Sequence, residues 1–156
     1  MNERRQVRDW AIKIGVCFLF AFCYSAGGSE DFGGLKILRR FLGPLILSAG
    51  MGYFSRDWRS LPMILLMPFS LSLGYGGDLE WLKILKRGVY GLANGVSSGC
   101  YDLLNKRWLL AGFQTLLLIA AYISFGVYNP FDNARIEEGT LGFLVAFIPM
   151  MSARRR

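Results

Sequence analysis

Apolar runs and short charged clusters alternate along this chain. Three of the apolar runs, at residues 10–26, 61–77 and 108–128, contain a single fully charged side chain, Lys13. At about 1.5 Å per helical residue, each run is long enough to cross most of a ~30 Å hydrocarbon core. Lys13 lies within one turn of the expected boundary, where its stem lets the ammonium group reach polar surroundings. The pattern therefore predicts three membrane helices.

Each of these runs is followed by a glycine-rich acidic bend and a second, returning apolar run. In residues 35–42 and 82–89, aliphatic side chains occupy one helical face and basic side chains another, as in an amphipathic helix. The apolar parts that remain, 41–54, 88–101 and 140–151, are shorter than the ~20 residues of an upright membrane helix. We expect these returning segments to span with their basic turns included, or else to be tilted or re-entrant.

One pattern occurs three times, about 48 residues apart. The motif Arg-Asp-Trp at 8–10 recurs at 56–58 and, as Lys-Arg-Trp, at 106–108. Glycines at matching places in the returning runs are Gly43, Gly91 and Gly142. Similarity at a fixed period indicates one supersecondary unit used several times. We therefore expect an all-α integral membrane protein, with one transmembrane domain over 1–156. It would consist of three helical hairpins and about six membrane segments, with repeats at approximately 8–55, 56–105 and 106–153.

Composition and charge favour a membrane over nucleic acid. The chain is 53% hydrophobic and only 19% charged, against about 25% charged in typical soluble domains. Its net charge of +7 comes from basic residues that flank apolar segments, where membrane orientation signals belong. Alternate connections carry ten basic and four acidic residues on one side, and seven of each on the other. The positive-inside rule then predicts both termini in the cytoplasm, most simply in a bacterial inner membrane, with the N-terminal arginines as a cytoplasmic flank.

Several chemistries have no candidate residues. The chain has no histidine, its cysteines Cys17, Cys23 and Cys100 lack zinc-site spacing, and no nucleophile has a base beside it. No Asp or Glu falls in the middle of an expected span, which argues against a proton-coupled carrier. We expect no catalytic residue, metal site or cofactor, and therefore no enzyme.

The fourth expected segment contains a GxxxGxxxG spacing that aligns small residues on one helical face. Such a face packs helices closely, within one chain or between copies as a glycine zipper, or it lines a pore together with nearby polar groups. The same polar groups could simply bond one helix to another. The pore or helix-interface candidates are Gly91, Asn94, Gly95, Ser97, Ser98, Gly99, Gln114 and Thr115.

The repeated basic turns are the candidate ligand sites. Their side chains could bind anionic lipid, concentrate anions at a pore mouth, or anchor the helices at the interface. The third repeat departs from the pattern, because Glu137 and Glu138 stand where basic residues are expected. The lipid or ligand candidates are Lys36, Arg39, Arg40, Lys83, Lys86 and Arg87.

Repeats, small-residue faces and polar positions within the segments are features of transport proteins. The sequence thus favours a small pore-forming or transporter-like protein for small ions or solutes. Two alternatives stay open: a non-transporting membrane subunit or anchor that binds a protein partner or anionic lipid, and a phage-type holin. The expected partners are the lipid bilayer and a second copy or another membrane protein, and not nucleic acid.

Overall fold

The computed structural model of the chain is all-helical wherever it is described. The described residues are 3–25, 33–56, 58–59, 62, 64, 80–128 and 134–153. Within them lie five helices and no strand. The helices are α1 (Glu3–Ser25), α2 (Gly33–Ser55), α5 (Glu80–Leu104), α6 (Trp108–Tyr128) and α7 (Ala134–Ser152). The all-α prediction is confirmed for this part of the chain, whereas the expected segment 61–77 lies almost wholly outside the described residues.

The returning segments are longer helices than their apolar parts alone. Helices α2 and α5 contain 23 and 25 residues, so the basic turns at their starts continue into the apolar stretches without a break. The shortest of the described helices, α7, has 19 residues and is therefore about 28 Å long. Each returning helix thus approaches or exceeds the thickness of a hydrocarbon core of ~30 Å.

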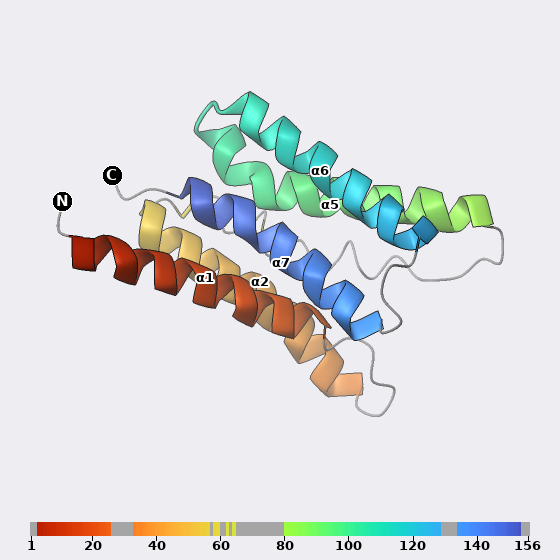
Figure 1. Cartoon of the computed structure of the whole chain (residues 1–156), viewed down its shortest axis with the longest axis horizontal. Coiled ribbons are helices and arrows are strands. Elements are labelled where there is room, and N and C mark those ends of the chain that lie inside the picture. The colour runs from red at the N-terminus through yellow and green to blue at the C-terminus, as the bar shows by residue number, and fades with distance from the viewer. Residues whose placement is uncertain are drawn as a thin grey trace.

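The helices run in two opposite directions. In Figure 1, α1 and α6 run one way, whereas α2, α5 and α7 run the other. The start of α1, the end of α2, the α5–α6 turn and the end of α7 consequently lie at one end of the molecule. The basic connections that the sequence assigns to one side of a membrane therefore meet at one end of the fold.

Helix α7 (blue in Figure 1) has a central position. It packs most extensively on α1 and also contacts α2, α5 and α6, whereas α5 and α6 form a closely packed pair. The last helix is therefore held mainly by the first one. A Cβ atom added to Gly142 of α7 would lie 2.8 Å from Cβ of Tyr24, so the absence of a side chain permits this close packing.

The glycines of α5 face α6. A Cβ atom at Gly91 would lie 2.6 Å from Cα of Ile119, and one at Gly95 would lie 2.6 Å from Cα of Thr115. At Gly99 an added Cβ would make only ordinary contacts. Backbones approach this closely only where a side chain is missing. The GxxxGxxxG face is therefore a contact between two helices of the same chain, tightest over its first two glycines.

Two turns at matching places in the repeat have the same backbone conformation. Among the described residues, Arg56 (φ 55°) and Lys106 (φ 59°) are the non-glycine residues with positive φ. Both follow the last residues of a returning helix, where a left-handed residue is the usual cap. At the second turn, Lys106 N donates to Leu103 O (3.1 Å) and Arg107 N donates to Asp102 O (2.8 Å), which is the Schellman pattern.

Large apolar side chains lie on the outside of the bundle. On α6, Leu109 is 91% exposed, Phe113 61% and Leu116 68%, whereas the amide side chain of Gln114 is completely buried. Of the described helices, α6 is the one whose length and composition suffice for a membrane span, and 22% of its most apolar window is buried. The helix therefore presents its hydrocarbon surface outward and its amide inward.

The close approach of α5 and α6 predicts a marked difference between two glycine substitutions. Gly95→Ala places a methyl group against the Thr115 backbone, which cannot move aside as a side chain does, so we expect a loss of about 1–3 kcal/mol of stability. Gly112→Ala on α6 is the matched control, since an added Cβ there meets nothing within 4 Å and both changes gain similar helix propensity. The measurement is thermal unfolding of the purified protein in detergent, and equal midpoints for the two variants would contradict this packing.

Candidate functional site

Three polar side chains of α5 point into the bundle at successive turns. Asn94, Ser98 and Asp102 are four residues apart and completely buried. Residues at this spacing share one helical face, about 6 Å apart along the axis. We call these three residues the polar face of α5. It lies beside the glycine face and is hydrogen-bonded to side chains of α6 and α7.

The first level of the polar face is at Asn94. Its Nδ2 group donates to the carbonyl oxygen of Tyr90 (2.9 Å) and to the hydroxyl of Tyr122 on α6 (3.3 Å). The Tyr122 hydroxyl is also hydrogen-bonded to the hydroxyl of Tyr24 on α1. Because Nδ2 faces a carbonyl group, the orientation of the amide is determined, and Oδ1 is left buried without a hydrogen-bond partner.

The second level joins α5 to α6 through Ser98 and Gln114. Gln114 Nε2 donates to Ser98 Oγ (2.6 Å), and Ser98 Oγ donates to the carbonyl oxygen of Asn94 (2.7 Å). With the hydroxyl hydrogen directed to Asn94, Ser98 can only accept from Gln114. Gln114 Oε1 is therefore the free end of the amide, and it is buried without a hydrogen-bond partner.

The third level joins α5 to the end of α7. Ser152 Oγ donates to Asp102 Oδ2 (3.0 Å), and Arg107 Nη1 donates to the carbonyl oxygen of Ser152 (3.3 Å). The same Nη1 atom is 3.7 Å from Asp102 Oδ1, which is an ion pair but longer than a hydrogen bond. Asp102 follows the apolar stretch 88–101, and its side chain is completely buried.

The opposite end of the bundle is closed by a further ion pair. Arg87 Nη1 donates to Glu137 Oε1 at 2.7 Å, joining the basic turn of α5 to the first turn of α7. Glu137 is one of the acidic residues that interrupt the basic pattern in the third repeat. Arg87 is thus occupied by an intramolecular partner, while Lys83 is exposed and Lys86 half-buried. The side chains of Lys36, Arg39 and Arg40 lie outside the described part of the structure.

The structure separates the pore or interface candidates into three groups. The glycines Gly91, Gly95 and Gly99 lie between α5 and α6. Asn94, Ser98 and Gln114 belong to the buried hydrogen-bond network. Ser97 and Thr115 are half-buried, and Thr115 Oγ1 donates to the carbonyl oxygen of Ala111 in its own helix (2.8 Å).

Besides Arg107, four members of the network were not among the sequence candidates. Tyr24 and Tyr122 lie inside long apolar runs, where a tyrosine carries no signal of a polar contact. Asp102 could have been found, because it lies four residues after Ser98 and eight after Asn94 on a predicted helix. The partners not predicted from the sequence are Tyr24, Asp102, Tyr122 and Ser152.

The unpaired atoms of this network are all acceptors. Asn94 Oδ1, Gln114 Oε1 and Asp102 Oδ1 are buried oxygens without a hydrogen-bond partner, whereas the donor groups beside them are bonded to protein acceptors. A buried acceptor without a donor costs about 1–3 kcal/mol. A water molecule or a cation can satisfy such oxygens, whereas an anion cannot. The chemistry of the interior therefore favours positively charged or hydrogen-donating species.

The Ser98–Gln114 hydrogen bond predicts a non-additive pair of substitutions. Ser98→Ala removes the acceptor of Gln114 Nε2 and leaves the amide buried with neither end bonded, so we expect a loss of about 1–3 kcal/mol. Adding Gln114→Leu removes the stranded amide at similar size, and the double variant should be more stable than Ser98→Ala alone. Unfolding of the wild type, both single variants and the double variant gives the coupling energy. Strictly additive losses would contradict the hydrogen bond.

The chain has no significant match among protein-family models, curated protein sequences or solved structures. Its fold and the chemistry of its interior are therefore the observations from which a function is inferred.

Proposed function

We propose that this chain is a small multi-pass membrane protein that passes small cations along the polar face of α5. Three buried acceptor oxygens without a hydrogen-bond partner, two on Asn94 and Asp102 of α5 and one on Gln114 of the facing helix α6, are the observation that carries this proposal. Three features of the described residues support it: the distribution of apolar side chains, the placement of the charged ends, and the composition of the interior.

The distribution of side chains suits a lipid environment. Apolar residues cover the outside of α6 while Gln114 is buried, which is the reverse of a helix in a water-soluble bundle. All four tryptophans, Trp10, Trp58, Trp81 and Trp108, have exposed side chains. Trp58 and Trp108 follow the ends of α2 and α5, and Trp81 is the second residue of α5, at its other end. These positions match the two aromatic belts of membrane proteins.

The helix directions support the proposed topology. With α1 and α6 opposite to α2, α5 and α7, the basic connections gather at one end, which the positive-inside rule assigns to the cytoplasm. In this topology the chain forms three helical hairpins in a bacterial inner membrane, with both termini cytoplasmic. Asp102, Ser152 and Arg107 then lie at the cytoplasmic end of the polar face, and the Arg87–Glu137 pair lies at the opposite end.

The interior supplies successive acceptor groups for a cation. Amide oxygens of Asn94 and Gln114 can replace part of the hydration shell of an ion, as carbonyl oxygens do in selectivity filters. Asp102 is a fully buried carboxylate on the same polar face of α5 as Asn94. A monovalent cation bound beside it would balance its negative charge. A cation that arrives at Asp102 Oδ1 would displace Arg107, whose guanidinium is 3.7 Å away and partly exposed. The Tyr24–Tyr122 and Ser98–Gln114 hydrogen bonds lie across the path along these acceptor oxygens. They would have to break as the ion passes and form again behind it.

The proposal predicts cation flux that depends on the buried amides. In liposomes, the purified protein should conduct monovalent cations, and Gln114→Leu or Asn94→Leu should reduce the flux at least about tenfold, since an acceptor site worth ~1.4 kcal/mol or more is lost. The matched control is Lys83→Gln, which changes an exposed charge outside the column. The measurement is ion flux together with the reversal potential in a salt gradient.

Two results would overturn this proposal. The first is an absence of flux from protein shown to be folded and inserted, and it would favour a non-transporting subunit. The second is an anion-selective reversal potential, which would be incompatible with a column of acceptors. Release of large dyes would instead indicate membrane disruption of the holin type.

A further inference from the structure

Exposed basic residues gather at the end of the molecule where α1 begins and α7 ends. They come from the start of α1, the connection after α2 and the turn between α5 and α6, which meet at this end (Figure 1). Of the described residues in these places, seven basic ones and one acidic one, Glu3, are exposed. The other described acids there are Asp9, which is half-buried, and Asp102, which is buried. This end therefore presents a strong positive charge to its surroundings.

Two of the seven basic residues are engaged within the protein. Arg107 donates to the carbonyl oxygen of Ser152, and Arg59 also has an interaction with the rest of the chain. The other five form no ion pair within the described part of the chain, so their charges are available to an external anion. We call these five residues the basic surface: Arg4, Arg5, Arg8, Arg56 and Lys106.

The first two turns of α1 extend beyond the other helices at this end (Figure 1). Every residue from 3 to 8 is exposed. Six residues of helix separate Arg4 from Trp10, which is about 9 Å along the axis and comparable with the thickness of one layer of lipid headgroups. With Trp10 in the aromatic belt at the edge of the hydrocarbon core, the arginines of α1 lie at the depth of the lipid phosphates.

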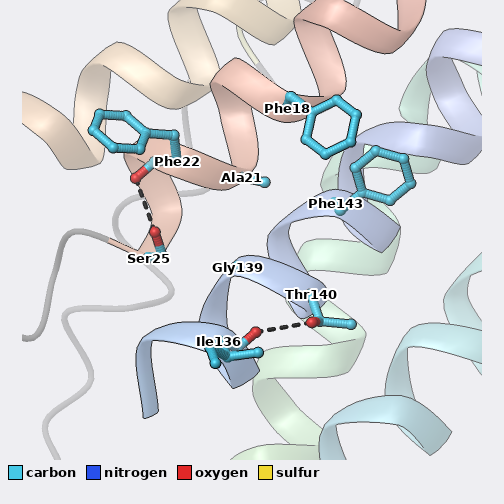
Figure 2. A pocket seen from close by; sticks show the side chains of 8 residues that line it. All are labelled: Phe18, Ala21, Phe22, Ser25, Ile136, Gly139, Thr140 and Phe143. Carbon is cyan, nitrogen blue, oxygen red and sulfur yellow. Dashed lines mark hydrogen bonds between the residues drawn. The ribbon is translucent and has the colours of Figure 1, made fainter. Parts of the chain in front are cut away.

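Exposed hydrocarbon begins directly beside these charges. On α1, Val7, Phe18 and Phe22 lie on the same side of the helix, and each is more than half exposed. Figure 2 shows the two phenylalanine rings on α1, with Phe18 against the ring of Phe143 from α7. On α6, Leu109 is almost completely exposed and follows the turn that carries Lys106 by three residues. A basic end directly beyond an apolar outer surface fits the headgroup level of a bilayer better than it fits a soluble acidic protein.

We infer that the basic surface binds the phosphate groups of anionic phospholipids on the cytoplasmic side of the membrane. A guanidinium group can donate two parallel hydrogen bonds to one phosphate, and each Lys or Arg near an anionic membrane surface strengthens binding about fivefold. This site lies at the opposite end from the basic turns that the sequence suggested, where Arg87 is bonded to Glu137. The inference rests on the membrane placement in the proposed function but not on ion passage.

The test measures which lipids lie beside single tryptophans. Two reporter proteins keep either Trp10, next to the basic surface, or Trp81, at the other end of the bundle, and have phenylalanine at the other three tryptophan positions. In liposomes, brominated phosphatidylglycerol or brominated phosphatidylcholine quenches the fluorescence of a nearby tryptophan. We expect phosphatidylglycerol to be preferred at least about tenfold beside Trp10 and clearly less beside Trp81. Added salt should reduce the preference, because it screens exposed charges.

Two double substitutions locate the site. Arg4→Gln with Arg8→Gln removes two charges from the basic surface, and it should lower the preference beside Trp10 at least about fivefold. Lys83→Gln with Arg135→Gln is the matched control, since it removes two exposed charges from the opposite end of the bundle. The control should leave the preference beside Trp10 unchanged.

The outcomes distinguish this inference from the proposed function. Equal quenching by the two lipids beside Trp10, in protein shown to be inserted, would overturn the lipid surface in favour of an acidic partner outside the membrane. An equal loss of preference in both double variants, or no loss in either, would also overturn it. A preference for phosphatidylglycerol in protein without cation flux would support the lipid surface and remove the transport proposal. Protein that is extracted from the liposomes by alkaline carbonate would overturn both.

Discussion

The close approach of α5 and α6 is the constraint on which the interior depends. Because Gly91 and Gly95 have no side chain, the two backbones meet with no room for even a methyl group. That distance brings Gln114 to Ser98, and it brings Tyr122 to Asn94 one turn further along. The glycine face and the polar face of α5 are thus adjacent and act together. The glycines set the distance between α5 and α6, and the polar side chains form hydrogen bonds across that distance.

The interior polar groups specify how the helices pack, because each needs a particular partner, although each hydrogen bond adds little to the stability. Hydrogen bonds between helices in lipid contribute roughly 0.6–2 kcal/mol each. Those at Asn94, Gln114 and Ser152 connect α5 to α6 and α7, and the one at Tyr24 connects α1 to α6. The three unpaired oxygens are the exception, and an unpaired buried oxygen is unfavourable for stability. Such groups are expected at a place that receives a ligand or water during function.

The polar face of α5 has no polar counterpart at the matching places of the other two returning helices. If the returning helices are aligned on Gly43, Gly91 and Gly142, the place of Asn94 is taken by Ile46 and by Val145. In the same alignment, Asp102 corresponds to Phe54 and to Ala153, both buried. Phe54, Val145 and Ala153 belong to the hydrophobic core, whereas α5 places polar groups at the matching positions. The Arg87–Glu137 pair shows the same division, because it joins the basic turn of the second repeat to the acidic one of the third.

Within the described residues, the sequence alone determined which segments are helical and which residues share a face of α5, because these depend on spacing within one segment. Three- and four-residue periods placed the glycines and the amides on neighbouring faces, and the basic clusters marked the helix ends that gather at one end of the fold. Only the tertiary structure decided which faces meet: that α7 packs on α1, that Tyr24 reaches Tyr122, and that Arg87 finds Glu137. The two side-chain pairs join residues 98 and 50 positions apart, and no local pattern encodes the rotation and tilt of one helix against another. They follow from the joint packing of all the helices, in which each small residue and each buried polar group must find its partner at once.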